Sequence, residues 1–240
     1  MTRTRTDPPP AAPPDDPVRP DWSTIDTVLL DLDGTLLDLA FDIQFWRHTI
    51  PSAWADARGL TLEQARERLA PLFRAREGTL EWYCTTFWSR ELQLDVSALK
   101  RATMHEVRWL AGVPEFLDTL RRNGKRLVLF TNAHPDSLAI KDERTRVSSY
   151  LDAMFSSHTF AWPKEDARFW VSVRRSEPFD PQRTLFVDDS PAVLAAARAA
   201  GIRWVIGVRH PDSQGTVRDH GPWPAVNRIT DLAGPGSGLR

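Results

Sequence analysis

Two carboxylates stand at the end of an apolar run in the stretch TVLLDLDGTLLD, residues 27–38. The run has the composition of a buried strand, and burying Asp31 or Asp33 without a partner costs several kcal/mol. Side chains alternate along a strand, so Asp31 and Asp33 are expected on the same side. Gly34 lets the chain turn away closely, and Thr35 can hydrogen-bond within the turn. The spacing predicts a pair of acidic groups delivered to one site, with a solvated turn as the alternative.

Two later apolar runs also end in polar side chains. Thr131 and Asn132 follow RLVLF, while Asp188 and Asp189 follow TLFV. If the strands are parallel, all these groups meet at one edge of the sheet. Two carboxylates 4 Å apart repel by about 4 kcal/mol at an effective dielectric of about 20, so a cation is required among them. Oxygen ligands with room for a phosphate oxygen favour Mg²⁺. Turn formation and helix capping are the alternative roles of these residues.

A lysine offers a second cation. Lys164 lies in the stretch AWPKED, directly after Pro163, where we expect a helix to begin. Only four of the 31 basic residues are lysines. A compact ammonium group at this position therefore favours a specific role over that of a surface lysine.

The elements that must position these groups are short β-rich runs bounded by turn or cap signals. Helical patterns alternate with these runs from about residue 112 onward. The sequence therefore predicts an α/β fold with a Rossmann-like parallel sheet. The expected strands cover residues 27–30, 126–130, 184–187 and 203–208, with a weaker one at 153–156.

Two helices of this sheet have clear signatures. The segment GVPEFLDTLRRNG carries a proline near its start, Gly124 as a stop signal, and apolar residues at helical spacing. The segment DSPAVLAAARAAG offers Ser190 as N-cap, Pro191 at the first helical position and Gly201 beyond the end. The apolar residues of the first helix are Val113, Phe116, Leu117 and Leu120.

An inserted helical unit separates the first strand from the second. Residues 40–111 have helical periodicity, many aromatic side chains, and a capping-box signal at Thr61 and Gln64. An insertion beside the carboxyl ends of parallel strands is well placed to cover a site there. We therefore expect a disordered proline-rich tail (1–21), an α/β core (22–39 and 112–232), a helical cap (40–111) and a flexible tail (233–240).

Composition restricts the environment and the partners. The net charge is -1, with 31 basic and 32 acidic residues, which gives no electrostatic footprint for nucleic acid or an anionic membrane. The single cysteine, Cys84, precludes an intramolecular disulfide, fits a reducing compartment, and is expected in the core. No apolar run approaches the ~20 residues of a membrane span. We expect a soluble, cytoplasmic protein with a small-molecule partner; the oligomeric state stays open.

The motifs DLDGT, FTN, a lysine and VDDS, in this order and at these separations, resemble the haloacid dehalogenase superfamily of phosphohydrolases. The helical insertion resembles the C1-type cap of that family. Among the members of this superfamily, the chain resembles bacterial GMP/IMP nucleotidases most in the stretches LLDLAFD, WYCTTFW, TNAHP, HTFAWPKED, TLFVDDS and HPDS. The resemblance covers residues 24–215 and implies hydrolysis of purine nucleoside 5'-monophosphates with Mg²⁺.

The resemblance also implies a role for each motif residue. Asp31 resembles a nucleophile that becomes an aspartyl phosphate, and Asp33 resembles the general acid and base. Mg²⁺ would be held by the Asp31 carboxylate, the Asp33 carbonyl and Asp189, with Asp188 as a ligand or an orienting group. The groups implied to hold the phosphate oxygens are Thr131, Asn132 and Lys164.

Four further residues are candidate substrate contacts. Trp46, Tyr83 and Trp88 could stack on a purine, although packing within the small cap is the favoured alternative for each. His134 follows the second strand, where it either contacts substrate or completes a turn.

Other functions share parts of this pattern. A phosphatase for sugar phosphates or phosphoglycolate, or a phosphomutase, would use the same core with a different cap. A dehalogenase would need the nucleophile but no acid, so Asp33 argues against it. A receiver-type signalling module also uses an acidic pair, a phosphorylated Asp, a Thr and a Lys, but its acidic pair comes first and it has no cap.

Overall fold

The computed structural model describes residues 19–233. Most of the expected N-terminal tail (1–21), and all but its first residue of the expected C-terminal tail (233–240), lie outside the described residues. The first element is a short 3₁₀ helix at Trp22–Thr24. Its tryptophan is buried and donates from Nε1 to the Leu232 carbonyl at 3.1 Å, which joins the two ends of the core.

The core is a six-stranded parallel sheet with the strand order β3-β2-β1-β4-β5-β6. The predicted α/β class and parallel sheet are confirmed. The strands are β1 Thr27–Leu30, β2 Arg126–Thr131, β3 Ala153–Ser156, β4 Thr184–Asp188, β5 Trp204–Val208 and β6 Ala225–Val226.

The strands differ from the prediction at their ends. β2 and β4 run one residue further than expected, so Thr131 and Asp188 are the last residues of strands. β5 begins at Trp204 instead of residue 203. β6 was not predicted, because two residues leave no readable periodicity.

The helices follow in chain order, and six of them precede β2. A π-helical turn at Phe45–Thr49 joins α1 to α2. The helices are α1 Ala40–Gln44, α2 Ile50–Asp56, α3 Leu62–Arg74, α4 Thr85–Leu92, α5 Val96–Ala102, α6 Val113–Arg122, α7 Pro135–Thr145, α8 Ala167–Ser176 and α9 Pro191–Ala199.

Most of the residues predicted to begin or end helices do so in the structure. Thr61 and Gln64 form the predicted capping box, and Gly124 has the positive φ of a helix stop. Ser190 is the N-cap of α9, as predicted, but its side chain makes no capping hydrogen bond, and Asp188 Oδ1 accepts from the Ser190 N–H at 2.8 Å. One prediction was wrong in detail. Lys164 lies in the turn before α8, which begins only at Ala167.

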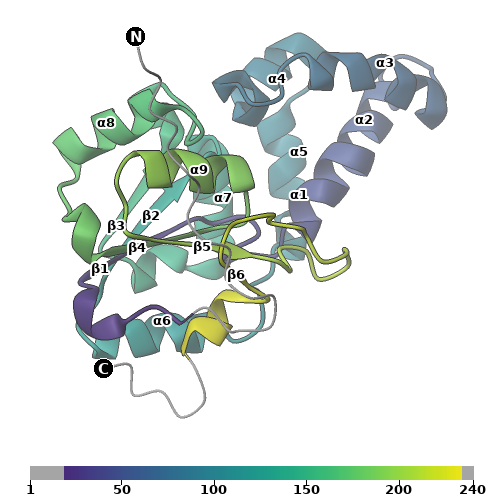
Figure 1. Cartoon of the computed structure of the whole chain (residues 1–240). Helices are drawn as coiled ribbons and strands as arrows, with labels where there is room; N and C mark the ends of the chain where they lie inside the picture. Colours follow the sequence, from purple (N-terminus) through teal and green to yellow (C-terminus); the bar gives the residue numbers. More distant parts are fainter. Residues whose placement is uncertain (1–18, 234–240) are drawn as a thin grey trace, which may run out of the picture.

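Helices cover both faces of the sheet (Figure 1). On β1, Val28 and Leu30 belong to the apolar cluster under α6, while Leu29 points into the cluster under α8 and α9. This alternation follows from the two-residue period of a strand. β1 is therefore buried on both faces at the centre of the sheet, and its carboxyl end is fixed in position.

Helices α1 to α5 stand beside the sheet as a separate lobe, at the upper right of Figure 1. They have their own apolar cluster around Phe45, Leu69 and Trp88. The chain rejoins the core earlier than the expected boundary at residue 111, because Val107 and Leu110 already pack in the core cluster. Cys84 was expected in a core, but it is half-buried and accepts a hydrogen bond from the Phe87 N–H.

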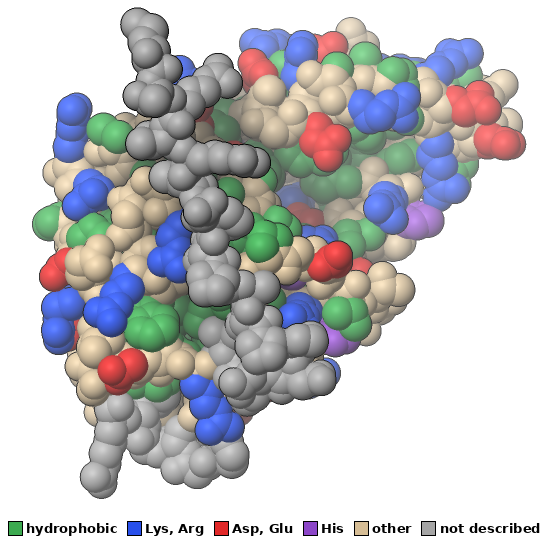
Figure 2. Space-filling model, viewed as in Figure 1, with side chains coloured by type: hydrophobic (Ala, Val, Ile, Leu, Met, Phe, Trp, Pro, Cys, Tyr) green, Lys and Arg blue, Asp and Glu red, His purple; other side chains and the backbone are tan. Residues whose placement is uncertain are grey.

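The surface carries interspersed charges. Figure 2 shows Lys and Arg side chains spread singly over the visible face of both lobes, with acidic side chains between them. Where the described residues are visible, that face shows no broad basic patch of the kind that binds nucleic acid. Within residues 19–233, none of the helices combines the length and the hydropathy that crossing a membrane requires.

Candidate active site

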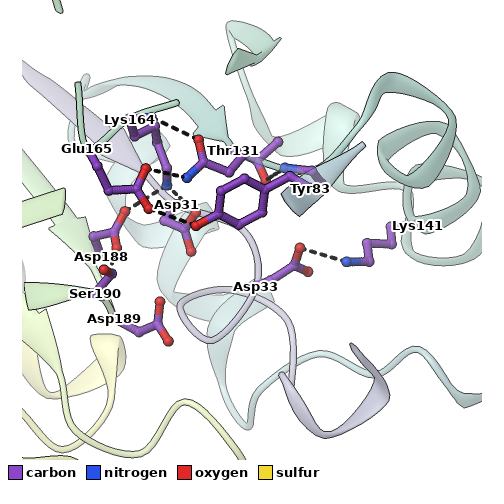
Figure 3. A network of polar contacts seen from close by, with 12 residues as sticks. Asp31, Asp33, Tyr83, Thr131, Lys141, Lys164, Glu165, Asp188, Asp189 and Ser190 are labelled. Carbon is purple, nitrogen blue, oxygen red and sulfur yellow. Dashed lines mark hydrogen bonds and ion pairs between the residues drawn. The ribbon is translucent and has the colours of Figure 1, made fainter. Parts of the chain in front are cut away.

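The carboxyl ends of β1, β2 and β4 bring the predicted polar residues together. Leu30 pairs with Val187, so Asp31 follows β1 directly beside Asp188 on β4. The Asp31 N–H donates to the Val187 carbonyl at 3.0 Å, which extends the sheet pairing by one residue. Figure 3 shows Asp31, Asp188 and Asp189 facing one space. One carboxylate oxygen from each lies within 4.8 Å of the others.

Lys164 provides the cation within this group. Its ammonium donates to Asp31 Oδ1 and, at 2.7 Å, to Asp188 Oδ2. The lysine side chain is 2 % exposed, so these contacts are sheltered from water. Although burial lowers it, the pKa of Lys164 is raised by Asp188 and Asp31. Lys164 is therefore charged and bridges Asp31 of the first motif, DLDGT, to Asp188 of the last, VDDS.

Lys164 and Arg218, which contacts Asp189, do not balance three carboxylates. Burial and neighbouring carboxylates raise the pKa of Asp31 to about 7, that of Asp188 to about 6 and that of Asp189 to about 7, against the effect of Lys164. Each shift reports an anion that lacks sufficient positive charge nearby. The donors are all carboxylate oxygens, which suit a hard divalent cation. The three residues therefore fit a metal of that class.

Gly34 allows this approach of the chain. Its φ is +92°, and a Cβ at this position would lie 2.7 Å from Asp189 Oδ2. Arg218, on the loop after β5, donates to the same oxygen at 2.5 Å. A side chain at position 34 would therefore push against the Asp189 carboxylate.

Asp33 does not join the carboxylate group. It faces the other way, toward Lys141 on α7, as Figure 3 shows. Lys141 Nζ lies 2.6 Å from Asp33 Oδ2 and 2.6 Å from Asp42 Oδ2 on α1. Asp33 Oδ1 is buried and finds no hydrogen-bond partner within residues 19–233. One oxygen of Asp33 is thus held by an ion pair, while the other is free to act.

The ion pair continues into the cap. Asp42 also accepts from Lys100 on α5 at 2.7 Å. Burial alone would raise the pKa of Asp42, but Lys100 and Lys141 hold it well below its usual range. Lys100 lies over the rings of Phe41 and Phe45, which add cation-π attraction. Two buried lysines and two partly exposed aspartates therefore form one chain of ion pairs from the site to the cap.

A second link joins cap and core. The Tyr83 hydroxyl, in the 3₁₀ turn Leu80–Tyr83, donates to Glu165 Oε1 at 2.7 Å. Asn132 Nδ2 donates to the other Glu165 oxygen at 2.9 Å, and Asn132 Oδ1 accepts from the Lys164 N–H. Figure 3 shows the Tyr83 ring over the Asp31 end of the site. Tyr83 is thus the cap residue at the candidate site.

The other candidate contacts have packing roles in this arrangement. Trp88 is 1 % exposed and donates from Nε1 to the Trp82 carbonyl, so it presents no ring face to a ligand. Trp46 packs edge-on against Phe45 and Trp88. His134 is the N-cap of α7 and also lies 2.9 Å from Thr85 Oγ1 of the cap.

The site is closed. Asp31 is 5 % exposed and Lys164 is 2 % exposed. A cavity of about 540 Å³ lies at the junction of α1 with segments 106–108 and 212–214, but its lining includes none of the site carboxylates. Asp31 and Lys164 are therefore largely shielded from solvent in this structure.

Five polar residues of this region were missed by the sequence interpretation. Asp42, Lys141 and Lys100 meet through tertiary contacts across about 60 to 100 residues of chain, and no spacing rule reports them. The small number of lysines could have indicated Lys100 and Lys141, because three of the four lysines are nearly fully buried around the site. The residues missed are Asp42, Lys100, Lys141, Glu165 and Arg218.

Comparison with protein families gives one match. The family model of haloacid dehalogenase-like hydrolases matches residues 25–201. The matched range contains the three strand ends, Lys164 and the whole helical insertion.

Individual relatives agree with this match. The chain is 43% identical over 211 residues to the GMP/IMP nucleotidase YrfG of Escherichia coli (strain K12), covering 86% of this chain and 93% of that protein. It is 30% identical over 189 residues to a phosphoglycolate phosphatase of Agrobacterium fabrum, covering 72% of this chain and 76% of the relative.

Solved structures share the fold. A HAD phosphatase from Thermococcus onnurineus superposes with a TM-score of 0.72 at 19% identity, covering 87% of this chain and 96% of that chain. CbbY from Rhodobacter sphaeroides, in complex with phosphate, gives a TM-score of 0.61 at 18% identity, covering 87% and 96%. At these identities, the similarities show a shared fold and nothing more specific.

The approach of Gly34 to Asp189 predicts a specific effect of Gly34→Ala. The added Cβ displaces the Asp189 carboxylate, so the affinity of the site for Mn²⁺, measured by titration calorimetry, falls about tenfold or more. Gly59→Ala is the matched control, because Gly59 has a φ of +61° with nothing within 4 Å of its added Cβ. Equal Mn²⁺ affinity in the two variants would contradict the assignment of Asp189 to a cation site.

Proposed function

The chain belongs to the haloacid dehalogenase-like hydrolases, and we propose that it is a Mg²⁺-dependent phosphatase acting on purine nucleoside 5'-monophosphates such as GMP and IMP. The observation that carries the reaction type is the grouping of Asp31, Asp188, Asp189 and Lys164 at one edge of the parallel sheet. Identity to the bacterial nucleotidases supports the substrate class. The helical lobe α1–α5 would serve as its cap.

Asp31 is the proposed nucleophile. Lys164 holds one carboxylate oxygen, and the other makes no hydrogen bond within residues 19–233. That oxygen forms a bond to phosphorus as the bond between phosphorus and the ribose 5' oxygen breaks, which gives an aspartyl phosphate. Burial at the end of β1 fixes its direction of attack.

Asp33 is the proposed acid and base. Its Oδ1 gives a proton to the departing 5' oxygen, so the nucleoside leaves as a neutral alcohol. It then takes a proton from water, whose oxygen attacks phosphorus while the bond to Asp31 breaks. Inorganic phosphate leaves, and Asp31 is regenerated.

The acidic residues would hold the metal. Asp31 and Asp189 contribute carboxylates and Asp33 its backbone carbonyl, while Asp188 is a ligand or an orienting group. When bound, Mg²⁺ neutralises charge on the phosphoryl oxygens and on the neighbouring carboxylates.

Three further groups are proposed to hold the phosphate. Thr131 Oγ1 accepts from the Ala133 N–H at 3.0 Å, which leaves its hydroxyl hydrogen for a phosphate oxygen. Asn132 keeps one amide hydrogen beyond its bond to Glu165. The Lys164 ammonium supplies positive charge. Together they stabilise charge that develops on the phosphoryl group in the transition state.

Lys141 is a positioning residue for Asp33. It is 1 % exposed and holds Asp33 Oδ2 at 2.6 Å, so the other oxygen keeps a fixed direction. Because Asp42 and Lys100 complete the ion-pair chain from the cap, closing the cap also sets the position of the acid.

Phosphoglycolate is the second candidate substrate, supported by the relative from Agrobacterium fabrum. The lower identity and smaller coverage of that relative favour the nucleotide. Both substrates use the same core chemistry.

A substrate panel tests the proposed activity. GMP, IMP, AMP, UMP, phosphoglycolate and glucose phosphates are assayed for phosphate release with Mg²⁺ and with EDTA. We expect fastest release from GMP and IMP and loss of release in EDTA. Absence of release from every nucleotide would contradict the substrate class, and EDTA-insensitive release would contradict the metal requirement.

Asp31→Asn tests the nucleophile. The amide keeps the shape of the side chain but cannot form the acyl phosphate, so kcat should fall about a thousandfold or more. Circular dichroism confirms that the variant is folded. Turnover near the native rate would show that another residue attacks phosphorus.

Lys141→Met tests the positioning of Asp33 through two substrates. With GMP, kcat falls about a hundredfold, because both proton transfers are impaired. With p-nitrophenyl phosphate the leaving group needs no proton, so a burst of nitrophenol equal to the enzyme concentration precedes slow turnover. Lys125→Met is the matched control, because within residues 19–233 the Lys125 ammonium bonds only the carbonyls of Trp22 and Ile25. Equal loss on both substrates without a burst would indicate a structural role alone.

A further inference from the structure

A second cluster of ligating side chains lies where the cap meets the core. Cys84 precedes α4 of the cap, His134 is the N-cap of α7, and His158 lies in the 3₁₀ turn Ser157–Phe160. One ligand atom from each lies within 4.8 Å of the others. The cluster shares no residue with the carboxylate site, and the proposed hydrolysis makes no use of Cys84 or His158.

His158 presents an unused nitrogen. Its Nε2 is buried and has no hydrogen-bond partner within residues 19–233. Its ring packs edge-on to His134, with centroids 5.0 Å apart and an angle of 77°. Burial, with His134 adding to it, lowers the pKa of His158 to about 4. The ring is therefore neutral at pH 7 and can offer a lone pair.

His134 and Cys84 are also held in place. The Thr85 hydroxyl lies 2.9 Å from His134 Nδ1, and burial lowers the pKa of that ring. The Phe87 N–H donates to Cys84 Sγ at 3.3 Å. A metal-bound thiolate would keep this donor, and a metal-bound imidazole would keep its hydroxyl partner, as ligands commonly do in metal sites.

We propose that Cys84, His134 and His158 form a binding site for a Zn²⁺-class cation that joins the cap to the core. This site goes beyond the proposed hydrolysis and is separate from the Mg²⁺ site. One thiolate and two imidazoles suit Zn²⁺ or Co²⁺ and are poor ligands for Mg²⁺, which prefers oxygen.

The geometry is close to that of a bound site. With Zn–N distances of about 2.0 Å and a Zn–S distance of about 2.3 Å, tetrahedral ligand atoms are about 3.5 Å apart. Side-chain movements on the order of 1 Å therefore close the cluster around an ion. Three protein ligands leave a fourth position for water.

The proposed metal site lies at the contact between the cap and the core. Cys84 directly follows Tyr83, which bonds Glu165 beside Lys164. Cys84 belongs to the cap, and both histidines belong to the core. A bound ion would therefore add a link between the two lobes next to the candidate active site.

Co²⁺ titration of the full chain, in excess Mg²⁺, tests the site. We expect a thiolate-to-cobalt absorption band that saturates at one equivalent and is bleached by Zn²⁺. Cys84 is the single cysteine of the chain, so any such band arises there. Absence of the band would overturn the proposal. The measurement involves no substrate, so its outcome is independent of the nucleotidase assignment.

Variants identify the other ligands. Cys84→Ser, which keeps an acceptor for the Phe87 N–H, should lose the band. His158→Asn and His134→Asn should each weaken Co²⁺ binding about tenfold or more. Thermal unfolding of each variant establishes that it is folded, and either histidine variant is sufficient for the test. Native Co²⁺ affinity in a folded histidine variant would overturn the site.

Discussion

The ion pairs between buried carboxylates and buried lysines are the interaction on which this structure depends. Asp31 and Asp188 close the central strands of the sheet, and burial there is costly unless positive charge lies within a few ångströms. Lys164 supplies part of that charge from a turn more than 130 residues from Asp31. The remaining imbalance is what makes the site suited to a divalent cation and to a dianionic phosphate. Hydrophobic residues at these positions would avoid the desolvation cost of buried charges, but they would bind neither a divalent cation nor a phosphate.

The same principle couples the cap to the core. Asp33 is paired with Lys141, Lys141 with Asp42, and Asp42 with Lys100, so one chain of alternating charges runs from the loop after β1 into α5. The bond from Tyr83 to Glu165 closes the opposite side of the site. Moving the cap breaks these contacts or exchanges them for water. The placement of the proposed acid therefore depends on the position of the cap.

Closure also explains why the chemistry is placed under a helical lobe. A site from which water is excluded strengthens the attraction between Lys164 and phosphoryl oxygens, because the local dielectric is lower. Most aromatic side chains of the lobe pack against one another and make it rigid. The lobe is accordingly a packed unit, and its Tyr83 contacts Glu165 at the site.

The sequence by itself determined the sheet, its main helices and the motif residues. Strand runs, proline and glycine signals, and polar groups directly after strands are local features, and parallel strands bring their ends to one edge whatever the details. Only the tertiary structure decided that Asp33 turns away from Asp31 toward Lys141, that Trp88 is buried in the cap, and that Cys84 leaves the core to meet His134 and His158. Those contacts join segments far apart in the chain, and their partners are set by packing between the two lobes, which no periodicity along the sequence records.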